Sequence, residues 1–177
     1  MAARNDGRNR LAMDETRRTT VTTPSDRELV ITRAFAAPRT VVFDAWTIPE
    51  HVARWWDPSR VPLAVCDIDL RPNGDFRFVN QGPSGLAHPF AGTYREIAPP
   101  ERLVFTVRDM PPGAESVGTL VFTEHDGTTI LTITIACRSK ADRDALLEMR
   151  VDVGTTRTLD NLEEFVGQIG QARSTRV

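Results

Sequence analysis

A chain of 177 residues is long enough for one domain with a well-buried core, and nothing in it argues for a second domain. Its net charge of −2 and charged fraction of 26% imply no bulk attraction to nucleic acid or to an acidic membrane. No apolar run approaches the ~20 residues of a membrane span, and residues 1–21 lack the apolar core of a signal peptide, so we expect a cytoplasmic protein that does not insert in membranes.

Residues 1–27 are polar and show no apolar periodicity. We therefore predict a disordered N-terminal extension, a folded domain over residues 28–169 and a flexible tail over residues 170–177. The extension is interpreted as inert, with a weak partner-binding tail as the alternative. The domain begins with the run ELVITRAF, whose alternation predicts a strand with Leu29 and Ile31, and also Arg33, on one face.

Two short helices are predicted after this strand. Pro38 suits the first position of a helix containing RTVVFDAW. Pro49 likewise starts the helix PEHVARWW, which the Asp-Pro dipeptide at residues 57–58 ends.

The middle of the chain consists of strand-like runs separated by turn residues. Arg-Pro-Asn-Gly at residues 71–74 is a hairpin signal, because proline suits an early turn position and Asn-Gly tolerates positive φ. The run TTILTITIAC alternates apolar residues with threonine, which is typical of a half-buried strand. We predict six strands, over residues 61–70, 75–80, 87–97, 102–108, 117–124 and 128–137.

The end of the domain predicts one long helix over residues 139–169. Ser139 can cap its first turn, Asp142 lies near the positive end of its dipole, and no proline interrupts it. Apolar or half-apolar positions recur three or four residues apart and form one stripe: Ala145, Met149, Val153, Thr156, Leu159, Leu162, Val166 and Ile169. The element order β-α-α-β6-α then indicates an α+β fold in which a curved antiparallel sheet grips this helix and encloses a cavity.

Motifs for metal or nucleotide chemistry are missing from the sequence. Cys66 and Cys137 are too few and too far apart for a disulfide framework or a zinc site, so we expect reduced thiols in the core. There is no HExxH, CxxC pair, P-loop, GxGxxG or nucleophile elbow. We therefore expect no cofactor and no bound metal, and no catalytic nucleophile can be identified.

Taken in order, several phrases resemble one family: PRTVVFDAWTIPEHVARWWDP, DIDLRPNGDFRF, AGTYREIAPPERLVFT and GTTILTITIAC, closed by the long helix. They are similar to the bacterial homologues of the heat-shock-protein ATPase activator, within the START-like (SRPBCC) helix-grip superfamily, over about residues 28–167. The resemblance implies the helix-grip fold. Because the superfamily includes lipid carriers, polyketide cyclases, aromatases and binders of hydrophobic molecules, it also implies a cavity for such a guest. Relatives often have glycine at the position of Asp57, so the resemblance does not imply an identical local loop here.

The candidate ligand site lies where the sheet faces the helix, although each of its residues could equally be plain core. Adjacent helical residues point about 100° apart, so Trp55 and Trp56 cannot both face the cavity. A buried Tyr94 phenol needs a hydrogen-bond partner, which a ligand or water could supply. The candidate binding residues are Trp46, Trp55, Trp56, Phe76, Phe78, His88, Phe90, Tyr94, Phe105, Met149 and Val153.

Other polar residues are assigned more ordinary roles. His51, in the second short helix, and His125, in a turn, are interpreted as surface residues, whereas His88 is the histidine expected near the pocket mouth. Asp67 and Asp69 alternate on one strand face and are interpreted as a solvated edge that discourages aggregation.

The leading hypothesis is a protein, monomeric or weakly dimeric, that binds a small hydrophobic or aromatic ligand and no nucleic acid. The first alternative is an enzyme of the polyketide cyclase or aromatase kind, in which His88, Tyr94 or a buried arginine orients water or polarises a carbonyl. The second alternative, suggested by the family name, is a chaperone-associated interaction module.

Overall fold

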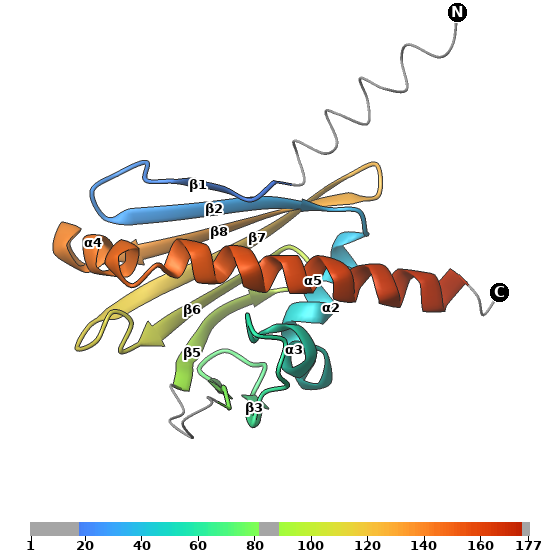
Figure 1. The fold of residues 1–177 in the computed structure, drawn as a ribbon, viewed down its shortest axis with the longest axis horizontal. Coiled ribbons are helices and arrows are strands. Elements are labelled where there is room, and N and C mark those ends of the chain that lie inside the picture. Colours follow the sequence, from blue (N-terminus) through green and yellow to red (C-terminus); the bar gives the residue numbers. More distant parts are fainter. Residues whose placement is uncertain (1–17, 82–88, 175–177) are drawn as a thin grey trace, which may run out of the picture.

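The computed structural model describes residues 18–81 and 89–174, and Figure 1 shows their arrangement. Eight strands form one antiparallel sheet in the order β1-β2-β8-β7-β6-β5-β4-β3. Figure 1 shows α5 lying lengthwise across one face of this curved sheet. Helices α2 and α3 both contact α5. The elements are β1 (Thr20–Thr22), β2 (Glu28–Phe35), α2 (Arg39–Thr47), α3 (Pro49–Trp55), β3 (Val65–Ile68), β4 (Asp75–Val79), β5 (Pro89–Ala98), β6 (Arg102–Arg108), β7 (Glu115–His125), β8 (Thr128–Cys137), α4 (Lys140–Glu148) and α5 (Val151–Ser174).

The predicted α+β helix-grip fold is confirmed by this architecture. The bounds of β2, β6 and β8 are those that apolar alternation predicts, and β3 to β8 form a meander of neighbouring antiparallel strands. In the predicted hairpin turn, Asn73 has a φ of 65°, the left-handed conformation that asparagine tolerates. The strand predicted over residues 61–70 is shorter than expected, because only Val65–Ile68 pair with β4.

The predicted long C-terminal helix is present as α5, but the prediction that it runs unbroken over residues 139–169 is wrong. The chain forms two helices, α4 and α5, and Arg150 between them has a φ of 57°. A left-handed residue cannot continue an α-helix, so the direction of the chain changes there. The start of α4 is as predicted, since the Ser139 side chain accepts a hydrogen bond of 3.1 Å from the backbone N–H of Asp142. The apolar spacing continued across the break, although Met149 is 51% exposed, so periodicity alone did not reveal it.

The predicted N-terminal disorder needs correction at its C-terminal end, while residues 1–17 lie outside the described residues. Thr20–Thr22 form β1, which pairs antiparallel with β2 and extends the sheet by one short strand. All three residues of β1 are exposed, so the strand buries no apolar side chain. A three-residue strand held by backbone pairing has no hydrophobic pattern by which the sequence could reveal it.

The apolar core fills the space between the sheet and helices α2, α3 and α5. Its largest fully buried side chains are Trp55, Phe35, Phe122, Leu29, Ile31, Leu103, Leu120, Leu131, Leu146, Leu159, Leu162 and Val42. Arg33 also lies on the inner face of β2, where its guanidinium donates to Asp160 and Glu163 of α5. The same guanidinium donates to the Thr19 hydroxyl, 3.1 Å away. This buried cation therefore connects β2, α5 and the residue before β1.

Candidate functional site

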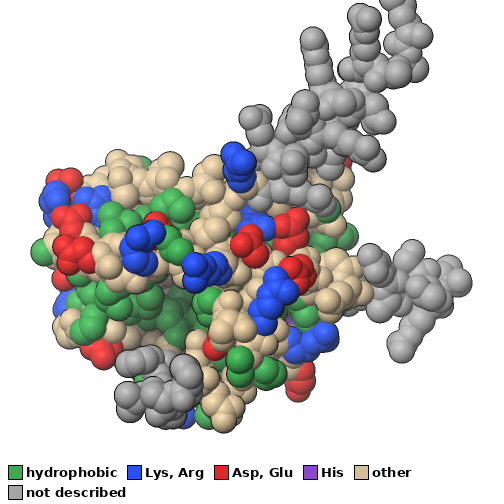
Figure 2. Space-filling view, in the orientation of Figure 1, with side chains coloured by type: hydrophobic (Ala, Val, Ile, Leu, Met, Phe, Trp, Pro, Cys, Tyr) green, Lys and Arg blue, Asp and Glu red, His purple; other side chains and the backbone are tan. Residues whose placement is uncertain are grey.

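A cavity of about 310 Å³ lies between the sheet and the two C-terminal helices. Figure 2 shows it as a hollow lined by hydrophobic side chains below α4 and α5. Its described lining residues come from seven elements and the loops beside them: Trp46, Trp56, Pro58, Asn80, Phe90, Phe105, Val107, Met110, Ser116, Gly118, Leu120, Ile133, Ile135, Leu146, Met149, Arg150, Val151, Gly154, Thr155, Thr158 and Leu159.

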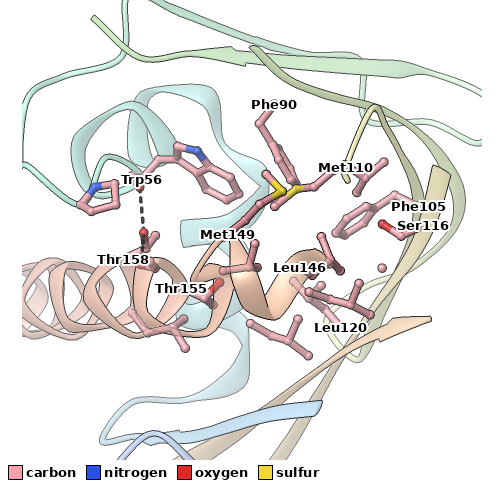
Figure 3. Close-up of a pocket in the computed structure, with 18 of the residues that line it drawn as sticks. Trp56, Phe90, Phe105, Met110, Ser116, Leu120, Leu146, Met149, Thr155 and Thr158 are labelled. Atoms are coloured by element: carbon pink, nitrogen blue, oxygen red, sulfur yellow. Dashed lines mark hydrogen bonds between the residues drawn. The ribbon is translucent and has the colours of Figure 1, made fainter. Parts of the chain in front are cut away.

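Each wall of this cavity has a distinct source. The helical wall includes Leu146 of α4 and Thr155 of α5, and Figure 3 shows both side chains directed at the strands opposite. The sheet wall includes Phe105 of β6 and Leu120 of β7, which alternate inward along their strands. Because Gly154 carries no side chain, the helical wall is recessed at that point, and nothing lies within 4 Å of where a β-carbon would be.

The mouth of the cavity lies at the break between the two helices. Met149 is 51% exposed and also lines the cavity, so its thioether separates the apolar interior from solvent. Arg150 is exposed and lines the same rim. Met110, from the loop after β6, points into the pocket together with Met149 (Figure 3). Methionine is flexible, so a rim of this composition can adapt to guests of different shape.

Behind the cavity, aromatic rings pack around a small crevice of about 20 Å³, which we call the aromatic crevice. Trp56 links the two spaces, since it lines both and its ring centroid lies 4.8 Å from that of Phe78 and 4.9 Å from that of Phe90. The crevice is lined by Trp46, Trp56, Phe76, Phe78, Phe90, Tyr94, Leu103 and Phe105. Burial raises the pKa of the Tyr94 phenol above its ordinary value, with a smaller contribution from Cys66, so the phenol stays protonated.

The three tryptophans have different roles in the structure. Trp55 is 1% exposed and donates its indole N–H to the backbone carbonyl of Ala45, 2.9 Å away, so it is the packing member of the adjacent pair. Trp56 faces the cavity, and its backbone carbonyl accepts a hydrogen bond of 3.2 Å from the Thr158 hydroxyl of α5 (Figure 3). Trp46 lines both the cavity and the aromatic crevice.

The structure divides the predicted site residues into groups. Those that line the cavity are Trp46, Trp56, Phe90, Phe105 and Met149. Those that line only the aromatic crevice are Phe76, Phe78 and Tyr94. Trp55 and Val153 line neither space, and His88 lies outside the described residues. Val153 is misplaced because the prediction assumed one continuous helix, whereas α5 begins anew after Arg150 and brings Gly154 and Thr155 to the cavity instead.

Sequence reasoning also missed part of the lining. Val107, Leu120 and Ile133 line the cavity from β6, β7 and β8. Their inward alternation was visible in the sequence. It does not distinguish a side chain that lines a cavity from one that is packed in the core, because both are buried apolar positions on the same strand face.

The polar candidates lie away from the cavity, as far as the structure describes them. His51 is half-buried, with Nδ1 3.2 Å from the backbone carbonyl of Asp44, and His125 is exposed at the end of β7. Asp67 and Asp69 are exposed at the β3 edge. Both cysteines are free thiols, and the described ranges contain no group of three His, Cys, Asp or Glu side chains placed to hold a metal ion.

The curved antiparallel sheet, the long helix across it and the cavity between them define a START-like helix-grip protein. A family model described as Activator of Hsp90 ATPase homolog 1-like protein matches residues 36–167, and the chain belongs to this family. A comparison with curated proteins finds no match. Among residues 18–81 and 89–174, no helix combines the length and apolar character needed to cross a membrane.

Solved bacterial structures share the fold. A protein from Nitrosomonas europaea has a TM-score of 0.75 at 26% identity, and the match covers 84% of this chain and 99% of that chain. A protein from Mycobacterium smegmatis has a TM-score of 0.72 at 28% identity, over 82% of this chain and 95% of that chain. A protein from Rhodobacter sphaeroides, with a TM-score of 0.78, is 22% identical over 85% of this chain and 98% of that chain.

Proposed function

We propose that this protein binds a small hydrophobic or aromatic molecule in the cavity between the sheet and helices α4 and α5. The supporting observation is the cavity itself, which is lined mainly by apolar side chains and opens at Met149. Its volume of about 310 Å³ lies at the lower end of the range for small-molecule sites. We expect the protein to act in the cytoplasm as a monomer or weak homodimer, without a nucleic-acid partner.

The size of the cavity limits the guest. A volume of about 310 Å³, at the lower end of the range for small-molecule sites, favours a compact guest of one or two rings. Larger guests, such as sterols or long fatty acids, would have to extend past Met149 into solvent. The proposed ligand is therefore a compact bicyclic compound or a short acyl chain.

The arrangement gives less support to an enzyme of the cyclase or aromatase kind. Of the described residues that line the cavity, only Arg150 carries an ionisable side chain, and it lies exposed at the rim. Proton transfer requires a titratable group within hydrogen-bond reach of the reacting atom. Tyr94 stays protonated in the aromatic crevice and can donate a hydrogen bond, but burial prevents it from acting as a base near neutral pH.

The experiment is a binding screen read by tryptophan fluorescence and by melting temperature. Bicyclic aromatic compounds should change the fluorescence of Trp46 and Trp56 and raise the melting temperature, because a ligand that binds only the folded state stabilises it by mass action. Fatty acids, aromatic polyketides and sterols complete the panel. The absence of a response to every compound would refute the proposal.

A variant at the rim separates a ligand site from tightly packed core. Met149→Trp should lower affinity at least tenfold with little change in stability, because Met149 is 51% exposed and the new ring has space to lie across the mouth. The matched control is Leu70→Trp, since Leu70 is 39% exposed and does not line the cavity. Unchanged binding in Met149→Trp, or equal losses in both variants, would contradict binding at this site.

A further inference from the structure

The indole nitrogen of Trp46 is a buried hydrogen-bond donor without an acceptor among the described residues. Trp46 lies near the end of α2, and its ring packs edge-on against Trp55, with 4.8 Å between centroids, and against Trp56, with 5.9 Å. These contacts fix the ring, so the nitrogen cannot turn freely to find a partner. Buried tryptophan N–H groups ordinarily have one.

The contrast with Trp55 shows that the surrounding fold can satisfy such a group. The Trp55 N–H donates to the carbonyl of Ala45 at 2.9 Å, within the same pair of short helices. Trp46 has no equivalent bond, although its ring borders both the cavity and the aromatic crevice. Trp56 also borders both spaces, and each of the three tryptophan rings contacts the other two. What distinguishes Trp46 is that its buried indole N–H has no acceptor among the described residues.

The surroundings of Trp46 restrict which acceptor could receive a hydrogen bond from its indole N–H. The aromatic crevice is lined by aromatic rings and Leu103, with the Tyr94 hydroxyl as its only side-chain oxygen among the described residues. An ionised carboxylate in such surroundings would lose its hydration without a cation to replace it, since Arg150 lies exposed at the rim. An uncharged acceptor, such as a carbonyl oxygen, has no such penalty.

We propose that the Trp46 indole N–H is the polar anchor of the ligand site, and that the natural guest is an apolar or aromatic compound with a carbonyl oxygen at its buried end. Ketones, quinones, esters and lactones belong to this class. The inference rests on the proposed function, because it requires a guest in the cavity. It adds a direction to binding: the carbonyl end enters first, and the remainder of the guest lies towards Met149.

A matched pair of probes tests the anchor in the full-length protein. 2-Acetylnaphthalene and 2-isopropenylnaphthalene are nearly equal in size and differ in having C=O or C=CH₂. The ketone should bind about three- to tenfold more tightly, the advantage expected of one net hydrogen bond. Phenylalanine variants assign the anchor. Trp46→Phe should abolish the preference, whereas Trp56→Phe, which changes another ring of the same cavity, should retain it.

Nuclear magnetic resonance provides a second readout that needs no variant to retain its affinity. The three indole N–H signals of the ¹⁵N-labelled protein can be assigned from the two phenylalanine variants. The ketone should move the Trp46 signal downfield, the hydrocarbon should not, and the Trp55 signal should stay in place because its bond to Ala45 is already formed. Equal affinities with a stationary Trp46 signal would overturn the anchor and leave the proposed function intact. If neither probe binds, and no member of the wider panel binds, the proposed function is refuted and the Trp46 anchor is refuted with it.

Discussion

Asn161 of α5 donates its side-chain amide to the backbone carbonyl of Asp57, 2.7 Å away, in the loop that follows α3. The same amide lies 3.3 Å from the carbonyl of Trp55, and both bonds are buried. The loop is tightened further by the Asp57 carboxylate, which accepts a hydrogen bond of 2.6 Å from the backbone N–H of Ser59. These bonds fix the end of α3, and with it the position from which Trp56 enters the cavity.

Asn161→Ala is expected to lower the free energy of unfolding by about 1–3 kcal/mol, because it removes two buried hydrogen bonds, to the carbonyls of Trp55 and Asp57. The Asp57 carbonyl keeps its bond of 2.9 Å from the backbone N–H of Arg60. Urea denaturation measures the change. The matched control is Gln168→Ala, on an exposed position of the same helix, which should stay within about 0.5 kcal/mol of the parent. Equal effects of the two substitutions would show that the amide does not hold the loop.

The fold was predictable because its signals are local and repeated. Alternation placed β2, β6 and β8, and the Asn-Gly pair placed one hairpin. The break at Arg150 could not be read in the same way, since the left-handed conformation of one non-glycine residue leaves no periodic trace. The unmatched Trp46 N–H was also beyond the sequence. Whether a donor has an acceptor depends on distances between elements that only the folded chain establishes.

Arg150 supplies a test of the helix break. Arg150→Gly should be more stable than Arg150→Ala by about 0.5–1 kcal/mol, because glycine adopts a φ of 57° without the steric cost of a β-carbon. At Arg157, an exposed interior position of α5, the order should reverse, with glycine about 1 kcal/mol less stable than alanine. Thermal or chemical unfolding of the four variants measures both differences. If alanine were more stable than glycine at Arg150 as well as at Arg157, residues 139–169 would form one continuous helix.

The apolar stripe of α5 should be a major source of stability. Leu159 and Leu162 are 1% and 0% exposed, and each substitution to alanine is expected to cost about 2–5 kcal/mol. The control is Leu70→Ala, at a position where the leucine is 39% exposed, which should change stability little. Chemical denaturation compares them. If the two helical variants unfold like the parent, α5 does not pack on the sheet as described.

Cys66 should titrate at unusually high pH. Burial, with smaller contributions from the charges of Asp67 and Glu50, raises the pKa of its thiol to about 11. Because folding favours the protonated thiol, this contribution to stability is complete below the ordinary cysteine pKa of about 9 and is lost as the pH rises towards 11.

Iodoacetamide alkylation measured at the Cys66 peptide should therefore be half-maximal near pH 11 in the folded protein and near pH 9 in urea. Asp67→Asn should lower the folded midpoint by removing a nearby negative charge, whereas Asp69→Asn, at an exposed neighbouring position, should leave it in place. A folded midpoint near 9 would show that solvent reaches the thiol freely.

Gly92 and Gly167 give a matched stability comparison, because a β-carbon would clash with its neighbours at the first and meet nothing within 4 Å at the second. A β-carbon on Gly92 of β5 would lie 2.0 Å from the carbonyl oxygen of Thr106 on the adjacent strand and 2.5 Å from the ring of Phe76. Neither neighbour can move easily, since the first belongs to the backbone of the sheet and the second packs against Phe78, Phe90, Tyr94 and Phe105. Gly92→Ala should therefore cost about 1–3 kcal/mol, the usual cost of overpacking a core.

Gly167 is the matched case in α5, because nothing lies within 4 Å of its β-carbon position. There alanine should raise stability by about 0.4–1 kcal/mol, through its better helix propensity and the reduced freedom of the unfolded chain. Urea denaturation gives both values, and tryptophan fluorescence reports whether Gly92→Ala disturbs the aromatic crevice next to Trp46 and Trp56. A Gly92→Ala protein as stable as the parent would mean that the strands and the Phe76 ring are not packed this closely. The crevice behind the proposed ligand site would then be looser than the structure indicates.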